Sequence, residues 1–281
     1  MSEALLSVRD LSVEFSTYGR TNRVLRSVSL DVPAHSQVAL VGESGSGKTV
    51  TMKAIMGLLR EPPAKITSGR ILYDGADLLT MPAKERLKLR GTAMSMVFQD
   101  PMSSLNPVFT IRDQMGTILK YADKRLGRSR SNVDRLARVH EVLEQVRMRD
   151  PERVSRSYPI ELSGGMRQRI LIAMALLSEP RLLIADEPGT ALDVTTQAQI
   201  LKLLKDLVKA RGLALLMITH NLGVVRETSD HVYVMNKGVV VEQGPAADIF
   251  AAPQHDYTRS LIAAVPRLTG GMRFGQQGAT R

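Results

Sequence analysis

Gly42-Glu43-Ser44-Gly45-Ser46-Gly47-Lys48-Thr49 is the segment from which the rest of the sequence can be interpreted, because it has the spacing G-x-x-x-x-G-K-[ST]. The glycines let backbone amides turn toward phosphate oxygens, and a helix that begins here points its positive end at them. Lys48 could reach the β- and γ-phosphates of a nucleotide, and Thr49 could offer its hydroxyl to Mg²⁺. This segment, the phosphate loop, predicts a nucleotide site.

The segments around the phosphate loop have the patterns that such a loop requires. Val38–Val41 is a short apolar run, which predicts a buried parallel strand, and Lys48–Arg60 has a helical pattern. A strand before the loop and a helix after it weigh against the alternative of a glycine-rich turn with a chance lysine. Upstream, apolar and polar residues alternate over Leu5–Val32, which predicts further strands.

A second apolar strand ends in two carboxylates. The run Leu182–Ala185 is followed by Asp186 and Glu187. The carboxyl edge of a parallel sheet is where such sheets bind ligands. Asp186 is therefore a candidate Mg²⁺ ligand, and Glu187 a candidate general base for an attacking water. A solvated acidic turn is the alternative, which the phosphate loop makes less attractive.

Two more polar residues follow short apolar strands. His220 comes after Leu215–Thr219 and could bind a γ-phosphate and orient the water. Gln99 comes after Met96–Phe98, and its amide could complete the contacts to Mg²⁺ or water. Taken alone, each residue has an ordinary alternative, a structural histidine and a surface glutamine, so both predictions depend on the phosphate loop.

A second anion site is predicted at Ser163-Gly164-Gly165, which precedes the helical run Gln168–Leu177. A serine hydroxyl and the backbone amides at a helix N-terminus can bind an anion. One nucleotide does not need two such devices from one chain. The sequence therefore favours a dimer in which these residues of one chain face the phosphate loop of the other.

Composition excludes several classes of protein. The chain has 281 residues, of which 43% are hydrophobic and 23% charged, as in globular proteins with a core. Without cysteine it can have no disulfide, iron–sulfur cluster or thiol nucleophile. No apolar run approaches the length of a membrane-spanning helix and no signal peptide is evident, so we expect a cytoplasmic protein. A net charge of +10 allows nucleic acid, an anionic membrane or a phosphorylated ligand as a partner.

The motifs together resemble the ATP-binding cassette (ABC) ATPases over roughly Leu5 to Pro266. In that family's terms, Gly42–Thr49 matches the P-loop, Gln99 the Q-loop, Leu162–Met166 the signature motif, Leu182–Glu187 the acidic strand, Ala191–Asp193 the D-loop and His220 the H-loop. Tyr18 would match the aromatic residue that stacks on adenine, with Phe15 as the alternative.

The resemblance implies an α/β fold: a P-loop NTPase core with a mainly parallel sheet, an N-terminal antiparallel β-subdomain and an inserted α-helical subdomain. We expect the ATPase domain at 1–266, with the helical insertion at about 105–178, and a flexible tail at 267–281. The helical spacing of Leu136, Val139, Leu143 and Val146 agrees with the insertion.

A narrower resemblance is to the oligopeptide and dipeptide importer ATPases, which include nickel and other small-solute importers. It rests on four segments, Gln99–Pro107, Ser163–Arg169, Ala191–Gln199 and His255–Leu261. It implies an ATP-hydrolysing subunit on the cytoplasmic face of the membrane, with ATP and Mg²⁺ as cofactors. Its implied partners are a second, paralogous ATPase, two transmembrane permeases and an extracytoplasmic solute-binding protein, and no nucleic acid.

The motifs allow other functions, and two positions differ from the family pattern. A nickel or other small-solute importer is the first alternative, and a soluble ATPase that acts on nucleic acid or ribosomes, or an exporter, is less favoured. Gly189 stands where the family usually has threonine or serine, and Asp256 where the C-terminal motif usually has proline. Neither departure removes a group that ATP hydrolysis needs.

Overall fold

A computed structural model describes residues 4–17, 19–190 and 192–264 of the chain. The strands are β1 (Ala4–Thr17), β2 (Arg20–Pro33), β3 (Gln37–Val41), β4 (Ala64–Tyr73), β5 (Ala76–Asp77), β6 (Met94–Val97), β7 (Leu182–Asp186), β8 (Ala214–Thr219), β9 (His231–Asn236) and β10 (Val239–Pro245). The helices are α1 (Lys48–Ile55), α2 (Ala83–Leu89), α3 (Pro101–Ser104), α4 (Ile111–Leu126), α5 (Asn132–Gln145), α6 (Pro151–Arg156), α7 (Gly164–Leu176), α8 (Val194–Arg211), α9 (Leu222–Thr228), α10 (Ala246–Ala251) and α11 (Asp256–Ala263), with a 3₁₀ turn at Pro159–Glu161.

The larger sheet is mainly parallel and has the strand order β10-β9-β3-β8-β7-β6. β3 pairs in parallel with β8 and β9, and β7 pairs in parallel with β6 and β8, whereas β10 joins β9 as an antiparallel edge strand. The carboxyl ends of β3, β6, β7 and β8 therefore meet at one edge of the sheet, where the predicted site residues follow.

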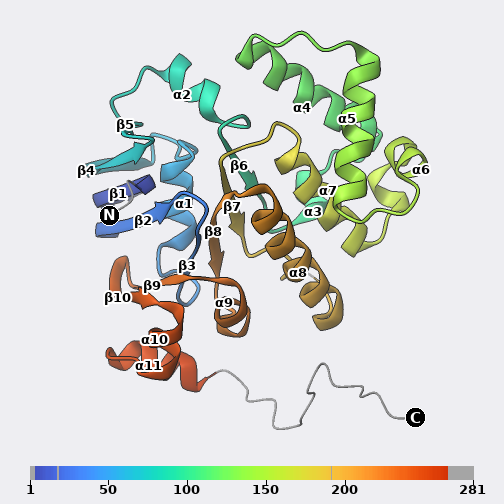
Figure 1. Ribbon diagram of the computed structural model, residues 1–281. Helices are drawn as coiled ribbons and strands as arrows, with labels where there is room; N and C mark the ends of the chain where they lie inside the picture. The colour runs from blue at the N-terminus through green and yellow to red at the C-terminus, as the bar shows by residue number, and fades with distance from the viewer. Residues whose placement is uncertain (1–3, 18, 191, 265–281) are drawn as a thin grey trace, which may run out of the picture.

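A four-stranded sheet in the order β2-β1-β4-β5 lies beside α1, on the left of Figure 1. Its strands pair antiparallel throughout. The apolar side chains of β1 and β2 are buried against α1 and the larger sheet, as the alternating sequence predicts. Together the two sheets confirm the predicted fold class, an α/β core with an antiparallel β-subdomain.

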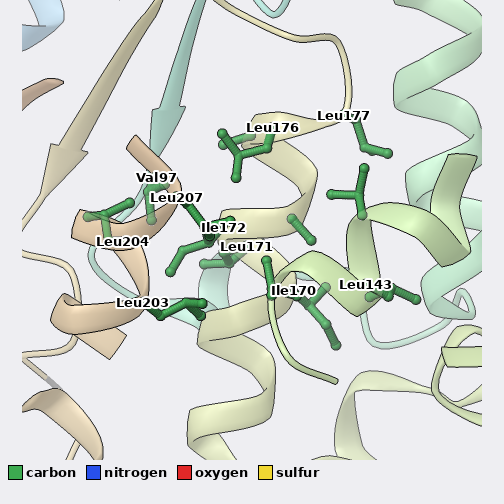
Figure 2. Close-up of a cluster of buried hydrophobic side chains, with 14 of the residues drawn as sticks. Val97, Leu143, Ile170, Leu171, Ile172, Leu176, Leu177, Leu203, Leu204 and Leu207 are labelled. Carbon is green, nitrogen blue, oxygen red and sulfur yellow. The ribbon is translucent and has the colours of Figure 1, made fainter. Parts of the chain in front are cut away.

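Helices α4 to α7 lie together on the other side of the larger sheet (Figure 1). Their apolar faces form one cluster with α8 and with β6 and β7. Figure 2 shows Ile170–Ile172 of α7 and Leu203, Leu204 and Leu207 of α8 within this cluster. Of the four residues with helical spacing noted in the sequence, Val139, Leu143 and Val146 are buried, while Leu136 is exposed. The cluster thus ties the helical region to the sheet.

Two helix ends illustrate how far the local sequence determines the elements. Gly212 is the C-cap of α8 and has the left-handed conformation (φ +60°) that glycine adopts readily after a helix. The helix predicted over Lys48–Arg60 instead ends at Ile55, because Gly57 also takes a left-handed conformation (φ +61°) two residues later. Among the described residues, no helix is both long and apolar enough to cross a membrane. The tail predicted at 267–281 lies outside the described residues.

Candidate active site

The phosphate loop connects β3 to α1, as its sequence predicts. Gly42, Gly45 and Gly47 have positive φ angles of 152°, 80° and 111°. A Cβ on Gly42 would lie 2.1 Å from the carbonyl oxygen of Met235, and one on Gly47 would lie 2.7 Å from a methyl carbon of Leu25. Glycine is therefore required both by the backbone conformation and by the space available.

Lys48 is buried at the base of the phosphate loop, with a relative exposure of 5%. Its Nζ donates hydrogen bonds to the carbonyl oxygens of Gly42 (2.7 Å) and Glu43 (2.9 Å). Burial lowers the pKa of Lys48, and the negative charges of Glu187, Asp186 and Glu43 oppose that shift. The Lys48 ammonium is bonded to neutral carbonyls and makes no ion pair with a carboxylate of the described residues. It can therefore exchange these partners for phosphate oxygens, which bind it more strongly.

Ser46 supplies a second observation that fits a phosphate. Its side-chain oxygen is buried and has no hydrogen-bond partner among the described residues. Buried polar atoms are normally satisfied, so an unpartnered hydroxyl inside the loop matches a ligand oxygen that would complete its bonding.

Three predicted catalytic residues converge at the end of β7. Glu187 Oε1 accepts a hydrogen bond from His220 Nδ1 at 2.8 Å, and Glu187 Oε2 accepts one from Gln99 Nε2 at 3.2 Å. These residues follow β7, β8 and β6 respectively, which are neighbours in the parallel sheet. The Glu187 side chain is 14% exposed and that of His220 is 50% exposed, so both remain within reach of solvent and ligand. The arrangement can orient a carboxylate toward a water molecule.

Asp186, one residue earlier, is a second carboxyl at the end of β7. It is 7% exposed and makes no ion pair with any residue that the structure describes. Burial and the charge of Glu187 raise its pKa, against the lowering effect of Lys48 and Lys53. A divalent cation would compensate this charge, so the residue fits Mg²⁺. Thr49, in the first turn of α1, is exposed.

The predicted second anion site forms the start of α7. Ser163 is the N-cap residue, and its Oγ accepts a hydrogen bond from the N–H of Met166 at 3.3 Å. A Cβ on Gly165 would lie 2.8 Å from Thr196, so glycine allows α7 to approach α8 closely. Ser163 and Gly164 are exposed. Within the described ranges, no hydrogen bond joins Ser163, Gly164 or Gly165 to the phosphate loop.

The two aromatic candidates for adenine stacking have different positions. Tyr18 lies outside the described residues. Phe15, the alternative, is half-buried near the end of β1 and packs against the core beneath the antiparallel sheet. Ala191 of the predicted D-loop also lies outside the described residues, whereas Asp193 of that motif is the N-cap of α8.

The two departures from the family pattern have local explanations. Gly189 has φ +101°, and a Cβ there would lie 3.3 Å from Gln197 Cγ, so a glycine is well suited to this turn. Asp256 is the first residue of α11, where an acidic side chain interacts favourably with the helix dipole, and it pairs with Arg259.

Two polar contacts of the site were missed by sequence reasoning. Thr190 Oγ1 lies 3.3 Å from Glu187 Oε2 and donates to it. Tyr257 Oη accepts a hydrogen bond from the N–H of Glu43 at 3.1 Å. The position of Thr190, three residues after Glu187, is a signal that could have been used. No local signal points to Tyr257, which lies 214 residues from Glu43.

Comparison with protein-family models gives two matches. Residues 25–190 match the family described as "ABC transporter". Residues 241–280 match the family described as "Oligopeptide/dipeptide transporter, C-terminal region". The first match includes the phosphate loop, the helical region and the acidic end of β7.

Two curated relatives are similar along nearly the whole chain. The peptidoglycan transport ATP-binding protein YejF of Agrobacterium fabrum is 51% identical over 95% of this chain and 48% of its own length. The chain therefore spans about half of that relative. The dipeptide transport ATP-binding protein DppD of Bacillus subtilis is 48% identical over 95% of this chain and 78% of its own length.

A solved structure has the same fold. The dimeric ATP-binding cassette MJ0796, in a post-hydrolysis state bound to ADP and Pi, superposes with a TM-score of 0.75. It is 26% identical and covers 86% of this chain and 98% of its own.

Proposed function

Since the chain belongs to the ABC transporter family, we propose that it is the ATP-hydrolysing, energy-coupling subunit of an importer for peptides. The observation that carries this proposal is the convergence of Gln99, Glu187 and His220 beside the phosphate loop. The match of residues 241–280 to the oligopeptide and dipeptide transporter region supports peptides as the solute class.

ATP is held by the phosphate loop in this proposal. The amides of Gly42–Thr49 surround the phosphates, and the Lys48 ammonium exchanges its carbonyl partners for the β- and γ-phosphate oxygens. Tyr18, or Phe15 in its place, stacks on the adenine ring. Mg²⁺, when bound, neutralises developing charge on the phosphates. Thr49, Gln99 and Asp186 are the residues that would hold it.

Glu187 is the general base of the hydrolysis step. Its carboxylate takes a proton from the water that attacks the γ-phosphate. Hydrogen bonds from His220 and Gln99 fix the direction of that carboxylate, so the water is held in line with the bond that breaks. His220 also lies at the sheet edge where it can donate to the γ-phosphate.

A second ATPase subunit completes the site. Ser163, Gly164 and Gly165 are exposed or half-buried at the start of α7, where a γ-phosphate bound to another chain can reach them. We take the second subunit to be a paralogue, so the dimer holds two ATP molecules between unlike chains. This account does not require nucleic acid as a partner.

An apolar groove beside Gln99 is the proposed contact with the permeases. It has a volume of about 450 Å³ and runs between α4, α7 and the end of β6. Phe98 and Tyr121 line it with exposed fractions of 47% and 58%. Its apolar lining and its position next to the site fit a short cytoplasmic helix of a permease subunit. The chain is thereby held at the cytoplasmic face of the membrane, and a solute-binding protein acts through the permeases from the other side.

Reconstitution tests this proposal. The chain should be co-expressed with candidate permeases and a candidate second ATPase from the same genome, and the purified complex placed in vesicles with a solute-binding protein. We expect short peptides to stimulate ATP hydrolysis and to be taken up. Uptake of Ni²⁺ with no response to peptides would contradict the solute class.

A groove variant tests the permease contact separately. Tyr121→Glu places a charge in the groove and should abolish co-purification with the permeases while ATP binding is retained. Tyr158→Glu is the matched control, because Tyr158 is also exposed but does not line the groove. Equal loss of permease by both variants, or by neither, would count against this surface.

A further inference from the structure

The C-terminal helix α11 contacts the phosphate loop directly. Tyr257 Oη accepts a hydrogen bond from the backbone N–H of Glu43 at 3.1 Å. Glu43 follows the first glycine of the loop, where the chain leaves β3 and begins to turn. The contact therefore joins the far end of the described chain to the point where the phosphate site begins.

The peptide group of Glu43 is held on both sides. Its N–H donates to Tyr257, and its carbonyl oxygen accepts from Lys48 Nζ at 2.9 Å and from the N–H of Ser46 at 3.2 Å. The orientation of one peptide thus connects Tyr257 with the lysine that binds phosphate. If the N–H side loses its partner, the carbonyl that positions Lys48 is less constrained.

Hydrogen bonds at the N-terminus of α11 hold the helix, and with it Tyr257, in position. The carboxylate of Glu242 on β10 accepts from the N–H groups of Gln254 (2.7 Å) and His255 (3.0 Å), just before the helix. His255 caps the helix by accepting from the N–H of Tyr257 at 3.1 Å. Although burial would raise the pKa of Glu242, the Thr258 hydroxyl and these two N–H groups lower it, as expected for a carboxylate that stays ionised.

A separate hydrophobic cluster connects α11 with β3 and α9. Its buried members include Ala39 and Val41 of β3, which leads into the phosphate loop, and Leu222 of α9, which follows His220. Tyr257 and Leu261 of α11 pack against this cluster. The C-terminal elements are therefore packed on the strand and the helix that carry the phosphate loop and His220.

We propose that Tyr257 is a positioning residue for nucleotide binding, and that β10 to α11 set the affinity of the phosphate loop for ATP through it. This inference rests on the proposed ATP site. Tyr257 does not touch the phosphates in this account. It fixes the Glu43 peptide before ATP arrives, and a loop that is already ordered loses less entropy when it binds.

The test is Tyr257→Phe, which removes the hydroxyl and keeps the ring in the cluster. ATP affinity of the chain, measured with a fluorescent ATP analogue, should fall about three- to tenfold, the equivalent of one modest hydrogen bond. In the assembled transporter, KM for ATP should rise by the same factor while kcat stays within about twofold of the unaltered enzyme. A purely structural role would lower the amount of folded protein without changing KM.

Tyr233→Phe is the matched control. Tyr233 Oη also accepts from a backbone N–H, that of Asp31, at 2.9 Å, but Asp31 lies on β2, away from the phosphate loop. This variant should bind the ATP analogue as the unaltered chain does. Equal affinity of Tyr257→Phe and the unaltered chain, or an equal loss in both variants, would overturn the role of Tyr257. If the unaltered chain binds no ATP at all, the proposed site itself is wrong and the inference falls with it.

Discussion

Glu187 sits in a left-handed backbone conformation, with φ +45°, directly after a strand that is completely buried. Such a conformation costs a non-glycine residue roughly 1–2 kcal/mol, so the surroundings must hold it in place. The N–H of Glu187 donates to the carbonyl of Ile218 at 2.8 Å, and its side chain is bonded to His220, Gln99 and Thr190. These contacts hold the strained residue and its carboxylate in one orientation.

The role of His220 can be tested through this contact. His220→Ala removes the 2.8 Å hydrogen bond to Glu187 and should lower kcat about 10²-fold or more, because the base is no longer oriented. ATP affinity should fall much less than kcat, since only one contact to the γ-phosphate is lost while Lys48 and the loop amides are untouched. His140→Ala serves as the control, because His140 contacts Ser155 on the helical side of the molecule. Unchanged kcat in His220→Ala would remove this residue from the mechanism.

Asp186 makes a prediction about stability and pH. The pKa of Asp186 in the folded chain is raised above the ordinary 3.8. At a pH between 3.8 and this raised pKa, the folded state therefore binds more protons than the unfolded state. The stability associated with protonated Asp186 is therefore complete below pH 3.8 and is lost as the pH rises through the raised pKa. Asp186→Asn should melt at a higher temperature than the unaltered chain at pH 7, with a smaller gain in acid, and should lose Mg²⁺-dependent turnover. If Asp186→Asn melts at pH 7 at the same temperature as the unaltered chain or lower, the buried carboxylate does not destabilise the fold as expected.

At this scale the sequence predicted some contacts and missed others for clear reasons. Gln99, Glu187 and His220 each follow a short apolar strand, and neighbouring parallel strands bring their ends together, so their convergence could be expected. Tyr257 could not be found, because its contact depends on how α11 packs against β3, and no periodicity encodes that packing. Thr190 was missed because a threonine in a turn is common.

Among the elements, the connection from β3 to α1 is the one most tightly constrained. Gly42→Ala would push a methyl group into the carbonyl of Met235, so the loop must shift and ATP binding should fall at least about tenfold. Gly75→Ala is the control, because Gly75 also has a positive φ (+80°) but has no atom within 4 Å of a Cβ. Both variants should lose about 1–3 kcal/mol of stability, and only the first should lose ATP binding. Similar nucleotide affinity in the two would contradict the close approach at Gly42.

Element types were easier to predict than element ends. The apolar run before Gly42 predicted β3, because a short, wholly apolar run before a glycine-rich loop is typical of a buried parallel strand. α1 ended earlier than its periodicity predicts, since Gly57 favours a left-handed stop over continued helix. Boundaries are set by such competition between weak local preferences.

For the whole molecule, two anion sites that share no hydrogen bond within the described part of the chain predict ATP-dependent association with a second ATPase. In Glu187→Gln, where ATP should persist, Mg²⁺ and ATP should produce a stable pair of ATPase subunits in size-exclusion chromatography with light scattering. Adding Ser163→Asp to Glu187→Gln should abolish the pair. Aspartate still caps α7, but it places a negative charge against the γ-phosphate.

The control for this experiment is Ser131→Asp at the N-cap of α5, which changes charge in the same way outside the proposed interface. This variant should associate normally. Association of Ser163→Asp to the same extent as Ser131→Asp would argue that Ser163 does not face a phosphate.

ATP turnover by Glu187→Gln in the assembled transporter, measured together with nucleotide binding, tests the account most directly. Glutamine keeps the size of the side chain and one oxygen that can accept from Gln99 or His220, but its amide cannot accept a proton from water. We predict ATP affinity close to that of the unaltered complex and hydrolysis reduced about 10²- to 10⁴-fold. Hydrolysis at a near-normal rate would contradict the assignment of Glu187 as the catalytic base.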